Sequence, residues 1–465
     1  MTAPGTTRAT APRGATASEG RSVDPGAVAP RAGSKHSATR ARDGGCFTLG
    51  VLDGGNVLAL GRCPCAFSPA HDGASLGTLA ELAADLGHRQ LWLTPAALEA
   101  LGLPVALGQL RGALAGHPFL EAAGRIVPAG QRALAPRLSC WGGDWPPFEL
   151  FVPAWDKGSP WTSLTFAPAL LAELVDFTDA TGMLWKGSGA ITSDAWLRAY
   201  YGNRLAAMDW PPPALDGNLE PDLHWHRLPL EGELRASRLM AFDVRGMYLS
   251  AASSLALPAG QYVHGRRSDA TPASVPGYWR CGSTWRSTPS ALRWREATAG
   301  RYRWDESYTW PESHRYLEPW YRTLRDGRAR LMASGAGVAL EALKAVYRQG
   351  VGRFGSVARS KPDDPLFVPY WRHAVQAEAR TRLERRIAGL SQQPAAVDVD
   401  CLYFLTSARS PERFAERVGL TLGDGLGRFR FVGEAPGRIA REALAEPNAR
   451  AALATLRGLV EGGQA

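Results

Sequence analysis

Two aspartates, Asp398 and Asp400, are separated by a single residue near the C-terminal end of the chain. Small and branched residues lead into the pair from residue 395, and the largely apolar residues 401–405 lead out of it. This pattern predicts a β-hairpin with both carboxylates on one face, because strand side chains i and i+2 point the same way. Like charges this close destabilise a half-buried hairpin unless a cation neutralises them, and Mg²⁺ takes hard oxygen ligands. A plain surface turn is the alternative interpretation.

A third aspartate, Asp243, follows an apolar strand at residues 239–242. Arg245 and Gly246 form a turn that leads directly into an apolar helix start, and Tyr248 lies at the base of that helix. A carboxylate at the end of a buried strand is costly unless it is paired or bound to a metal. Asp243 is therefore the third candidate metal ligand.

The stretch 242–249 resembles motif A of the palm of family B DNA polymerases, Asp-x-x-Ser-Leu-Tyr-Pro. Asp243 and Tyr248 match this motif. The Ser, Leu and Pro positions carry Gly246, Met247 and Leu249.

Two more stretches are similar to motifs of the same family, and they occur in the family's order. Residues 343–355 align without a gap to motif B, Lys-x-x-x-Asn-Ser-x-Tyr-Gly with a following Lys-Phe as in the protein-primed branch. Lys344, Gly352 and Phe354 match, Arg353 keeps the basic character of the Lys, and Asn, Ser and Tyr are replaced by Arg348, Gln349 and Val351. Motif C, Asp-Thr-Asp-Ser in a hairpin, falls on residues 398–401. The resemblance covers residues 239–433, a little under half of the chain.

The resemblance implies nucleotidyl transfer with two metal ions, Mg²⁺ or Mn²⁺, held by Asp243, Asp398 and Asp400. Fixed cations stabilise the charge on the phosphoryl oxygens in such reactions. Lys344 has this role by motif, and Arg325 and Arg328 are added as i, i+3 neighbours on a helix predicted at 317–332. For these arginines the alternative is a solvated helix face.

The family position of Tyr248 implies a ring that stacks under the incoming sugar and excludes a 2′-hydroxyl, and a packed core tyrosine is the alternative. The DNA contacts expected from the same resemblance are Gly352, Arg353, Arg428 and Arg430. The expected partners are a DNA template and primer, deoxynucleoside triphosphates and a terminal protein that primes synthesis.

The N-terminal part has a different character. Residues 1–44 are rich in Ala, Thr, Ser, Gly, Pro and Arg and hold almost no large apolar residues, which predicts a disordered basic tail. A helix is predicted at 166–181 by its apolar spacing, and strands, turns and helices before it are predicted at 47–53, 57–60, 76–86, 88–93 and from residue 96. This order resembles a ribonuclease H-like unit, as in the exonuclease domains of polymerases. Asp53 is followed by Gly55 where those domains carry the second metal ligand, so we expect an inactive exonuclease-like domain.

Other metal-ligating residues do not form a recognisable site. Cys63 and Cys65 are too close together for a zinc knuckle, and no second Cys/His pair provides the other two zinc ligands. His224 and His226 flank a tryptophan in a pattern more typical of packing and surface residues than of ligands. The cysteines are therefore interpreted as reduced thiols.

Length and charge agree with this organisation. The 465 residues allow two or three domains, and the formal net charge of +9 favours a polyanionic partner such as nucleic acid. No apolar run is long enough to cross a bilayer, so we expect a cytoplasmic, nucleoid-associated protein.

We therefore expect an α+β and α/β multidomain chain. Its predicted parts are a tail at 1–44, a ribonuclease H-like domain at 45–232, a polymerase palm at 233–435 with inserted helical fingers at about 285–356, and one C-terminal helix within 436–465 as a short thumb. The expected function is template-directed DNA synthesis for a plasmid, mobile element or replicon end. The alternatives are a nucleic-acid-binding replication accessory protein on the same fold and, third, a nuclease that uses Asp53.

Overall fold

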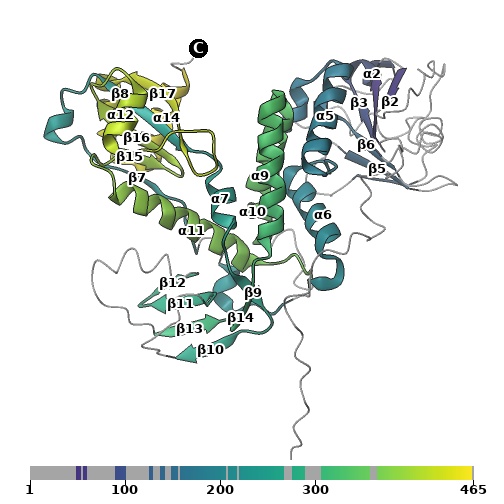
Figure 1. Cartoon of the computed structure of the whole chain (residues 1–465), viewed down its shortest axis with the longest axis horizontal. Coiled ribbons are helices and arrows are strands. Elements are labelled where there is room, and N and C mark those ends of the chain that lie inside the picture. Colours follow the sequence, from purple (N-terminus) through teal and green to yellow (C-terminus); the bar gives the residue numbers. More distant parts are fainter. Residues whose placement is uncertain are drawn as a thin grey trace, which may run out of the picture. The chain divides into compact units, whose positions relative to one another are not determined.

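A computed structural model of the chain describes residues 49–53, 56–59, 90–100, 125–128, 137–141, 148–155, 158–205, 208–216, 219–266, 275–287, 305–356 and 364–462 (Figure 1). The chain divides into two units, residues 1–38 and 39–465, and every described residue belongs to the second unit. The predicted tail at 1–44 and the predicted helix at 76–86 lie outside the described residues.

The first sheet contains six strands in the order β2-β1-β3-β6-β5-β4. Its strands are β1 (Leu49–Asp53), β2 (Asn56–Ala59), β3 (Gln90–Leu93), β4 (Arg125–Pro128), β5 (Arg137–Trp141) and β6 (Phe148–Phe151). β1 and β2 form the predicted hairpin, β3 lies parallel to both β1 and β6, and α2 (Pro95–Ala100) follows β3. These strands and this helix confirm the predicted elements, while the ribonuclease H-like assignment remains a prediction.

An aromatic cluster joins this sheet to the helices α5 (Ala167–Thr181) and α6 (Gly189–Tyr201). Trp92 of β3 stacks on Phe151 of β6 at 4.7 Å between ring centroids, and Trp161 meets Trp92 edge-on at 5.9 Å. Such rings remove much apolar surface from water at a small loss of side-chain freedom. The predicted helix at 166–181 is confirmed as α5.

Two small antiparallel sheets are formed by strands between residues 257 and 314. One has the order β10-β13-β11-β12 and the other pairs β14 with β9. Their strands are β9 (Leu257–Ala259), β10 (Val263–Arg266), β11 (Gly277–Cys281), β12 (Thr284–Arg286), β13 (Glu306–Thr309) and β14 (Glu312–His314). Short 3₁₀ turns elsewhere span Pro153–Trp155, Pro160–Ser163, Gly202–Arg204, Pro212–Leu215 and Glu231–Glu233.

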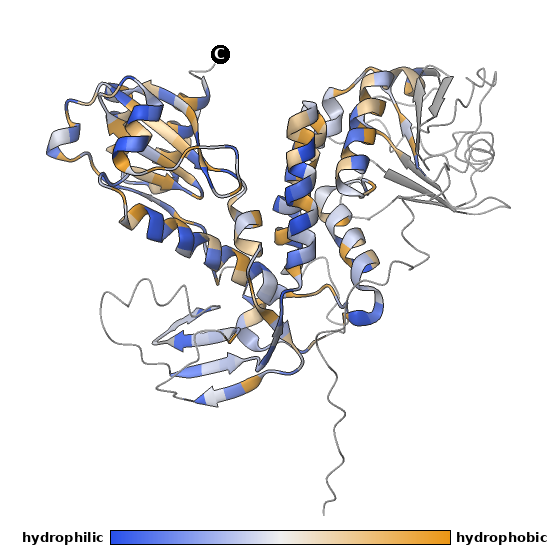
Figure 2. Ribbon diagram, viewed as in Figure 1, coloured by the Kyte–Doolittle hydropathy of each residue, from blue (hydrophilic) through white to orange (hydrophobic). Residues whose placement is uncertain are grey.

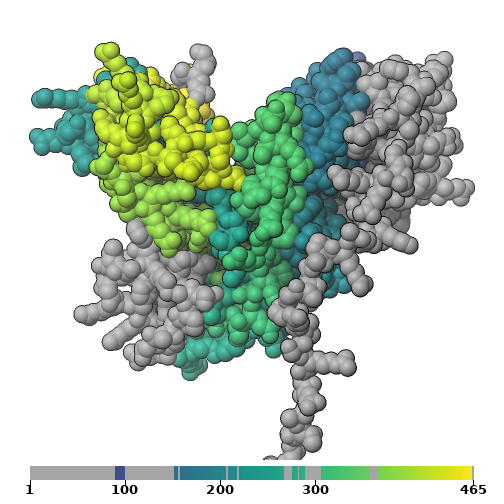
Figure 3. Space-filling view, viewed as in Figure 1, coloured from purple at the N-terminus to yellow at the C-terminus, as the bar shows by residue number. Residues whose placement is uncertain are grey.

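Three long helices come next: α9 (Leu317–Ser334), α10 (Gly337–Phe354) and α11 (Pro369–Ala388). The predicted helix at 317–332 is confirmed as α9, which ends at the left-handed Gly335. Glu173 of α5 accepts a hydrogen bond from the backbone N–H of Ala339 at 2.7 Å and so satisfies one of the free donors at the start of α10. In the space-filling view the green surface of α9 and α10 continues into the blue surface of α5 and α6 (Figure 3).

The five-stranded sheet has the order β17-β8-β16-β15-β7, with antiparallel pairs throughout. Its strands are β7 (His224–His226), β8 (Arg238–Val244), β15 (Ala396–Asp398), β16 (Cys401–Thr406) and β17 (Phe429–Pro436). The strands carry mostly apolar residues (Figure 2). The predicted hairpin around the Asp-x-Asp pair is confirmed as β15–β16.

Alternation along the strands gives this sheet two different faces. Phe242 and Phe404 pack on Phe414 of α12 (Pro411–Val418), with ring centroids 5.9 and 5.4 Å from Phe414. Leu239 and Tyr403 belong to a separate core on the opposite face, shared with the C-terminal helices α13 (Gly437–Leu444) and α14 (Ala449–Gly462). The sheet is therefore buried on both faces along the Leu239 end of β8.

The C-terminal segment differs from the prediction of one helix. It forms two helices, α13 (Gly437–Leu444) and α14 (Ala449–Gly462). Pro447 lies between them, and a proline lacks the backbone N–H and disfavours helical geometry in the residue before it. Across the part of the chain that the structure describes, no helix has the length and apolar character needed to span a membrane.

Candidate active site

Asp243 lies at the C-terminal end of β8, between the two strands that pair with β8. It is opposite Cys401 on β16 and Arg430 on β17. The chain then turns at Gly246, whose φ of 56° is left-handed, and enters α7 (Met247–Ala252). A Cβ at Gly246 would come within 2.7 Å of the Leu426 side chain, so both the backbone angle and the space favour glycine here. Asp243 is thus held beside the β15–β16 hairpin.

Val399 and Asp400 form the two-residue tip of that hairpin. Val399 has a φ of 58°, and it is the one non-glycine residue with positive φ in the described ranges. A β-branched residue in this region is strained by roughly 1–3 kcal/mol, and such strain persists only where neighbouring contacts impose it. Here the backbone N–H of Val399 donates to the Leu223 carbonyl at 2.7 Å, and the N–H of Val244 donates to the Asp400 carbonyl at 3.0 Å. The tip, and Asp400 with it, is fixed on two sides.

The carboxyl groups of Asp243 and Asp400 meet at this point and share a hydrogen bond. Burial and the adjacent charge of Asp243 raise the pKa of Asp400 to about 8. Two carboxylates this close cannot both ionise without cost, so one of them keeps a proton when no cation is present. The fold brings these acids from positions 157 residues apart (400 minus 243) into one site.

Arg430 is the nearest fixed cation. Its Nε donates to Asp243 Oδ2 at 2.7 Å, with side-chain exposures of 45% for Arg430 and 16% for Asp243. The charge of Arg430 opposes the rise in the pKa of Asp400. Arg428, two residues earlier, lines a cavity beside α11 instead. Only one of the two predicted DNA-contact arginines on this segment therefore faces the acids.

Asp398 does not join the pair, contrary to the expectation of three converging carboxylates. Its side chain is 4% exposed, forms an ion pair with Arg457 of α14 and is hydrogen-bonded to His224 of β7, whose Nδ1 lies 2.9 Å from Asp398 Oδ1. The expectation relied on strand alternation between residues i and i+2. Alternation fails here because β15 ends at Asp398 and the positive φ of Val399 turns the chain before Asp400.

The remaining pair still fits a hard divalent cation. Asp243 and Asp400 present carboxylate oxygens, the ligand type that Mg²⁺ prefers in sites completed by water and phosphate. Asp243 lies near enough to Asp400 for its charge and a side-chain hydrogen bond to raise the pKa of Asp400. In the described ranges no cluster of three or more His, Cys, Asp or Glu side chains is arranged to hold a metal by itself. Any metal here would therefore need ligands from a bound substrate or from solvent.

Tyr248 projects from α7 next to the acids. Its hydroxyl donates to Asp222 Oδ1 at 2.5 Å, and the ring is half-buried. Burial, together with the charges of Asp222 and Asp400, raises the pKa of Tyr248 well above its ordinary value. Tyr248 therefore stays a neutral hydroxyl held in one orientation. Sequence reasoning did not identify Asp222, because no local sequence pattern indicates that it pairs with Tyr248.

Tyr347 of α10 is a second residue that the sequence interpretation missed. It is 6% exposed, and burial raises its pKa to about 12, with Arg328 lowering the pKa and Asp243 raising it. The Tyr347 hydroxyl lies 3.8 Å from the position that a Cβ on Gly246 would take. Tyr347 lies one helical turn before Val351, the position at which the motif B resemblance expects a tyrosine.

The two predicted arginines of α9 differ from each other. Arg325 is exposed, pairs with Asp326 at 2.8 Å and lies over the Tyr321 ring at 5.6 Å. Arg328 is buried and donates to the Asp424 carbonyl at 2.8 Å. Arg328 therefore connects α9 to the loop before β17. Arg325 instead lies on a solvated helix face, the alternative given for these arginines.

The predicted residues of α10 also separate. Lys344 pairs with Glu341 on its own helix, and Gly352 is exposed with open space around it. Arg353 forms an ion pair with Asp194 of α6, and burial raises the pKa of Asp194 while Arg353 opposes the rise. Arg353 thus belongs to the interface between two helices rather than to an open surface.

Comparison with known proteins gives structural neighbours only. No family model matches the chain, and no curated protein matches it. The chain is similar to phi29 DNA polymerase complexed with primer-template DNA, with a TM-score of 0.47, 10% identity and coverage of 80% of this chain and 79% of that chain. It is also similar to phi29 DNA polymerase in its ternary complex with primer-template DNA and incoming nucleotide substrates, with a TM-score of 0.44, 10% identity and coverage of 78% and 79%. Similarity at this level carries no argument about function, which is inferred from the residues of the site.

Proposed function

We propose that this chain is a DNA polymerase-like nucleotidyltransferase that extends the 3′ end of a DNA primer on a template. The observation that supports this most is the meeting of Asp243 and Asp400 beside the fixed tip of the β15–β16 hairpin. A half-buried carboxylate whose pKa is raised by burial and by a second carboxylate beside it is costly to keep, and such groups are common at active sites. The motif A and motif C resemblances fall on these same two acids.

Asp243 and Asp400 would hold Mg²⁺ or Mn²⁺, which would neutralise their charge and that of the triphosphate. Asp398 is omitted from this assignment because Arg457 and His224 already satisfy it. In the reaction the primer 3′-oxygen forms a bond to the α-phosphorus, the bond from that phosphorus to the bridging oxygen breaks, and pyrophosphate leaves. The 3′-hydroxyl proton passes to solvent or to a nearby base.

The surrounding side chains supply orientation and charge. We assign Tyr248, which Asp222 holds, to the sugar of the incoming nucleotide. We assign Arg430, which pairs with Asp243, to a phosphate of the primer strand. Lys344 remains our candidate for the triphosphate, since its Glu341 pair is exposed and of small energy. A terminal protein and a plasmid, mobile element or replicon end remain expectations from the sequence resemblance.

A second candidate function is supported by one specific contact. Arg430 already contributes a cation to Asp243, so the acid pair has partial neutralisation without metal. A replication accessory protein that binds nucleic acid on the same fold, without synthesis, would keep such a pair.

Primer extension separates the two functions. Wild type is compared with Asp243→Asn and Asp400→Asn in Mg²⁺ and in Mn²⁺, and Asp364→Asn serves as the matched control because Asp364 forms an ion pair with Arg198 remote from the acids. We expect each site variant to lose at least about 10³-fold in rate, the usual scale for removing a group that stabilises the transition state. Unchanged extension in Asp400→Asn, or none in wild type, would exclude the polymerase proposal.

A further inference from the structure

A cavity of about 300 Å³ lies between the C-terminal end of α11 and the loop that leads into β17. Its lining includes Arg385, Arg386 and Leu390 from α11 and its end, and Leu426, Arg428 and Phe429 from the loop and strand. This volume is at the lower limit of small-molecule pockets, close to the size of one nucleotide unit.

This cavity and the acid pair lie on opposite sides of β17. Phe429 packs into the core that contains Phe242, whereas the next residue, Arg430, reaches Asp243. Alternation along the strand separates the two directions. The cavity is therefore a different site from the candidate active site, although both are built on the same edge strand of the sheet.

The arginines of the cavity have no carboxylate partner among the residues that the structure describes. Within the described ranges Arg385, Arg386 and Arg428 form no ion pair, unlike Arg382 one turn earlier, which pairs with Glu378 at 2.7 Å. Arg386 donates to the Gly427 carbonyl and lies over the Phe429 ring at 5.6 Å from the centroid, so its guanidinium is held in place. Partial burial and the nearby charges of Arg382 and Arg428 lower the pKa of Arg386. A bound anion would relieve this repulsion.

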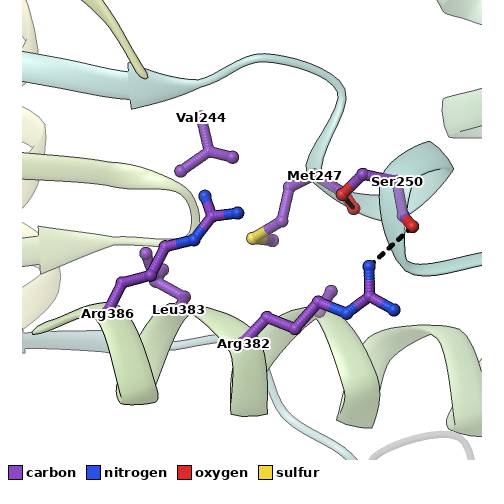
Figure 4. Close-up of a pocket in the computed structure, with 7 residues that line it drawn as sticks. Val244, Met247, Ser250, Arg382, Leu383 and Arg386 are labelled. Carbon is purple, nitrogen blue, oxygen red and sulfur yellow. Dashed lines mark hydrogen bonds between the residues drawn. The ribbon is translucent and has the colours of Figure 1, made fainter. Parts of the chain in front are cut away.

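Figure 4 shows that the neighbouring arginine, Arg382, is hydrogen-bonded to Ser250 of α7. Arg382 and Arg386 project from α11 towards α7, and Arg382 donates to the Ser250 carbonyl at 2.8 Å and to Ser254 Oγ at 2.8 Å. The space between them and Met247 is only about 10 Å³, which holds one water at most. Arg382 thus joins α11 to α7, whereas the larger cavity beyond Arg386 is lined by arginines that form no ion pair with any described residue.

We propose that this cavity is a second phosphate-binding site that takes the phosphate of a nucleotide. Guanidinium groups match phosphate oxygens in paired hydrogen bonds, and three of them surround the space. The hydroxyl of Thr421 adds a polar contact, and Leu390 and Leu426 offer apolar surface for a sugar or base. The phosphate comes from a single DNA strand or from a free nucleotide. The proposal does not depend on catalysis by the acid pair.

The test compares the full-length variant R385Q/R428Q with R438Q/R450Q, which removes the same charge from α13 and α14. Arg386 is left intact because it supports the loop through Gly427. Binding of a fluorescent oligothymidylate is measured by anisotropy in EDTA over a series of sodium chloride concentrations. We expect R385Q/R428Q to bind about five- to tenfold more weakly than the control, with a salt dependence reduced by roughly 0.7 per lost phosphate contact.

A fluorescent dATP identifies the source of the phosphate. Weakened dATP binding in R385Q/R428Q assigns the site to a free nucleotide, and weakened oligothymidylate binding alone assigns it to a DNA strand. If R385Q/R428Q binds both probes as R438Q/R450Q does, the phosphate site is wrong. R385Q/R428Q, R438Q/R450Q and Asp400→Asn are each measured both in phosphate binding and in primer extension. Loss of extension in Asp400→Asn with normal phosphate binding separates the proposed function from this site.

Discussion

Asp398 and Asp400 are two residues apart, yet the fold treats them in opposite ways. Asp398 is buried with two positively charged or chargeable partners, Arg457 and His224. Asp400 is placed against another carboxylate, Asp243, and its pKa rises to about 8. A buried carboxylate with its own positively charged partners holds elements together. A carboxylate next to a like charge is destabilised in its ionised form, and a bound cation removes this destabilisation. One short motif thus contains a structural anchor and a candidate catalytic group.

The residue between them produces this difference. Val399 adopts a left-handed φ of 58°, so the strand alternation that would have aligned the two acids is broken at the tip. Asp398 then points to α14, and Asp400 points to the end of β8. Substitutions at the two acids, at their partners and at Val399 can test whether the acids really differ in this way.

The largest expected effect is on the rate of primer extension. We expect Asp398→Asn to keep extension within about tenfold of wild type, because the Asn oxygen can replace Oδ2 as the acceptor for Arg457 and its amide N–H can donate to Nδ1 of a neutral His224, while Asp400→Asn loses about 10³-fold or more. Single-turnover rates at a temperature where both variants remain folded give the comparison. Equal losses in the two variants would mean that Asp398 also contacts the reacting groups.

The next effect is on folding stability through the anchor. Arg457→Gln leaves Asp398 buried with His224 as its remaining partner, and we expect the free energy of unfolding to fall by about 2–3 kcal/mol. Arg438→Gln is the control, because its pair with Glu442 is exposed on one helix and contributes less than about 0.5 kcal/mol. Urea unfolding measures both. A loss no larger than the control would show that the Arg457 contact does not anchor α14.

A smaller effect is expected on pH dependence in the absence of metal. The pKa of Asp400 is raised from 3.8 in the unfolded chain to about 8 in the folded protein, so the folded state binds the extra proton. Stability therefore falls as pH rises from about 4 to about 8 and levels off above that. In EDTA we expect Asp400→Asn to be more stable than wild type at pH 9 by on the order of 1–2 kcal/mol, and by much less at pH 5.

Metal addition provides the control for this pH effect. Mg²⁺ at pH 9 should raise the melting temperature of wild type more than that of Asp400→Asn, because a ligand that binds the folded state stabilises it. The idea of a strained acid pair fails if the two proteins respond identically to pH in EDTA.

The smallest expected effect concerns the hairpin tip. Val399→Gly relieves the left-handed strain but loses some apolar contact and adds freedom to the unfolded chain, so we expect a change in stability within about 1 kcal/mol. Val397→Gly in the adjacent strand is the matched control and should cost about 2–3 kcal/mol, since Val397 is fully buried. Thermal unfolding distinguishes the two variants, and comparable losses would argue against strain at Val399.

Much of the local structure could be predicted from sequence. The β15–β16 hairpin, the strand before Asp243 and the helices α5 and α9 follow from apolar periodicity and turn residues, which act over a few neighbouring positions. The prediction of a single C-terminal helix was wrong, although Pro447 was a visible signal for the break. The ribonuclease H-like assignment, the domain boundaries and the roles of the site residues remain predictions.

The sequence alone determined which acids are available, in what order they occur and on which kinds of element they lie. Only the tertiary structure decided that Asp243 and Asp400 meet and that Asp398 pairs with Arg457 and His224. It also decided that Arg353 pairs with Asp194. The physical reason is that a carboxylate's role depends on which charges and how much water surround it after folding. Those neighbours come from strands and helices far away in the chain, and no local pattern records them.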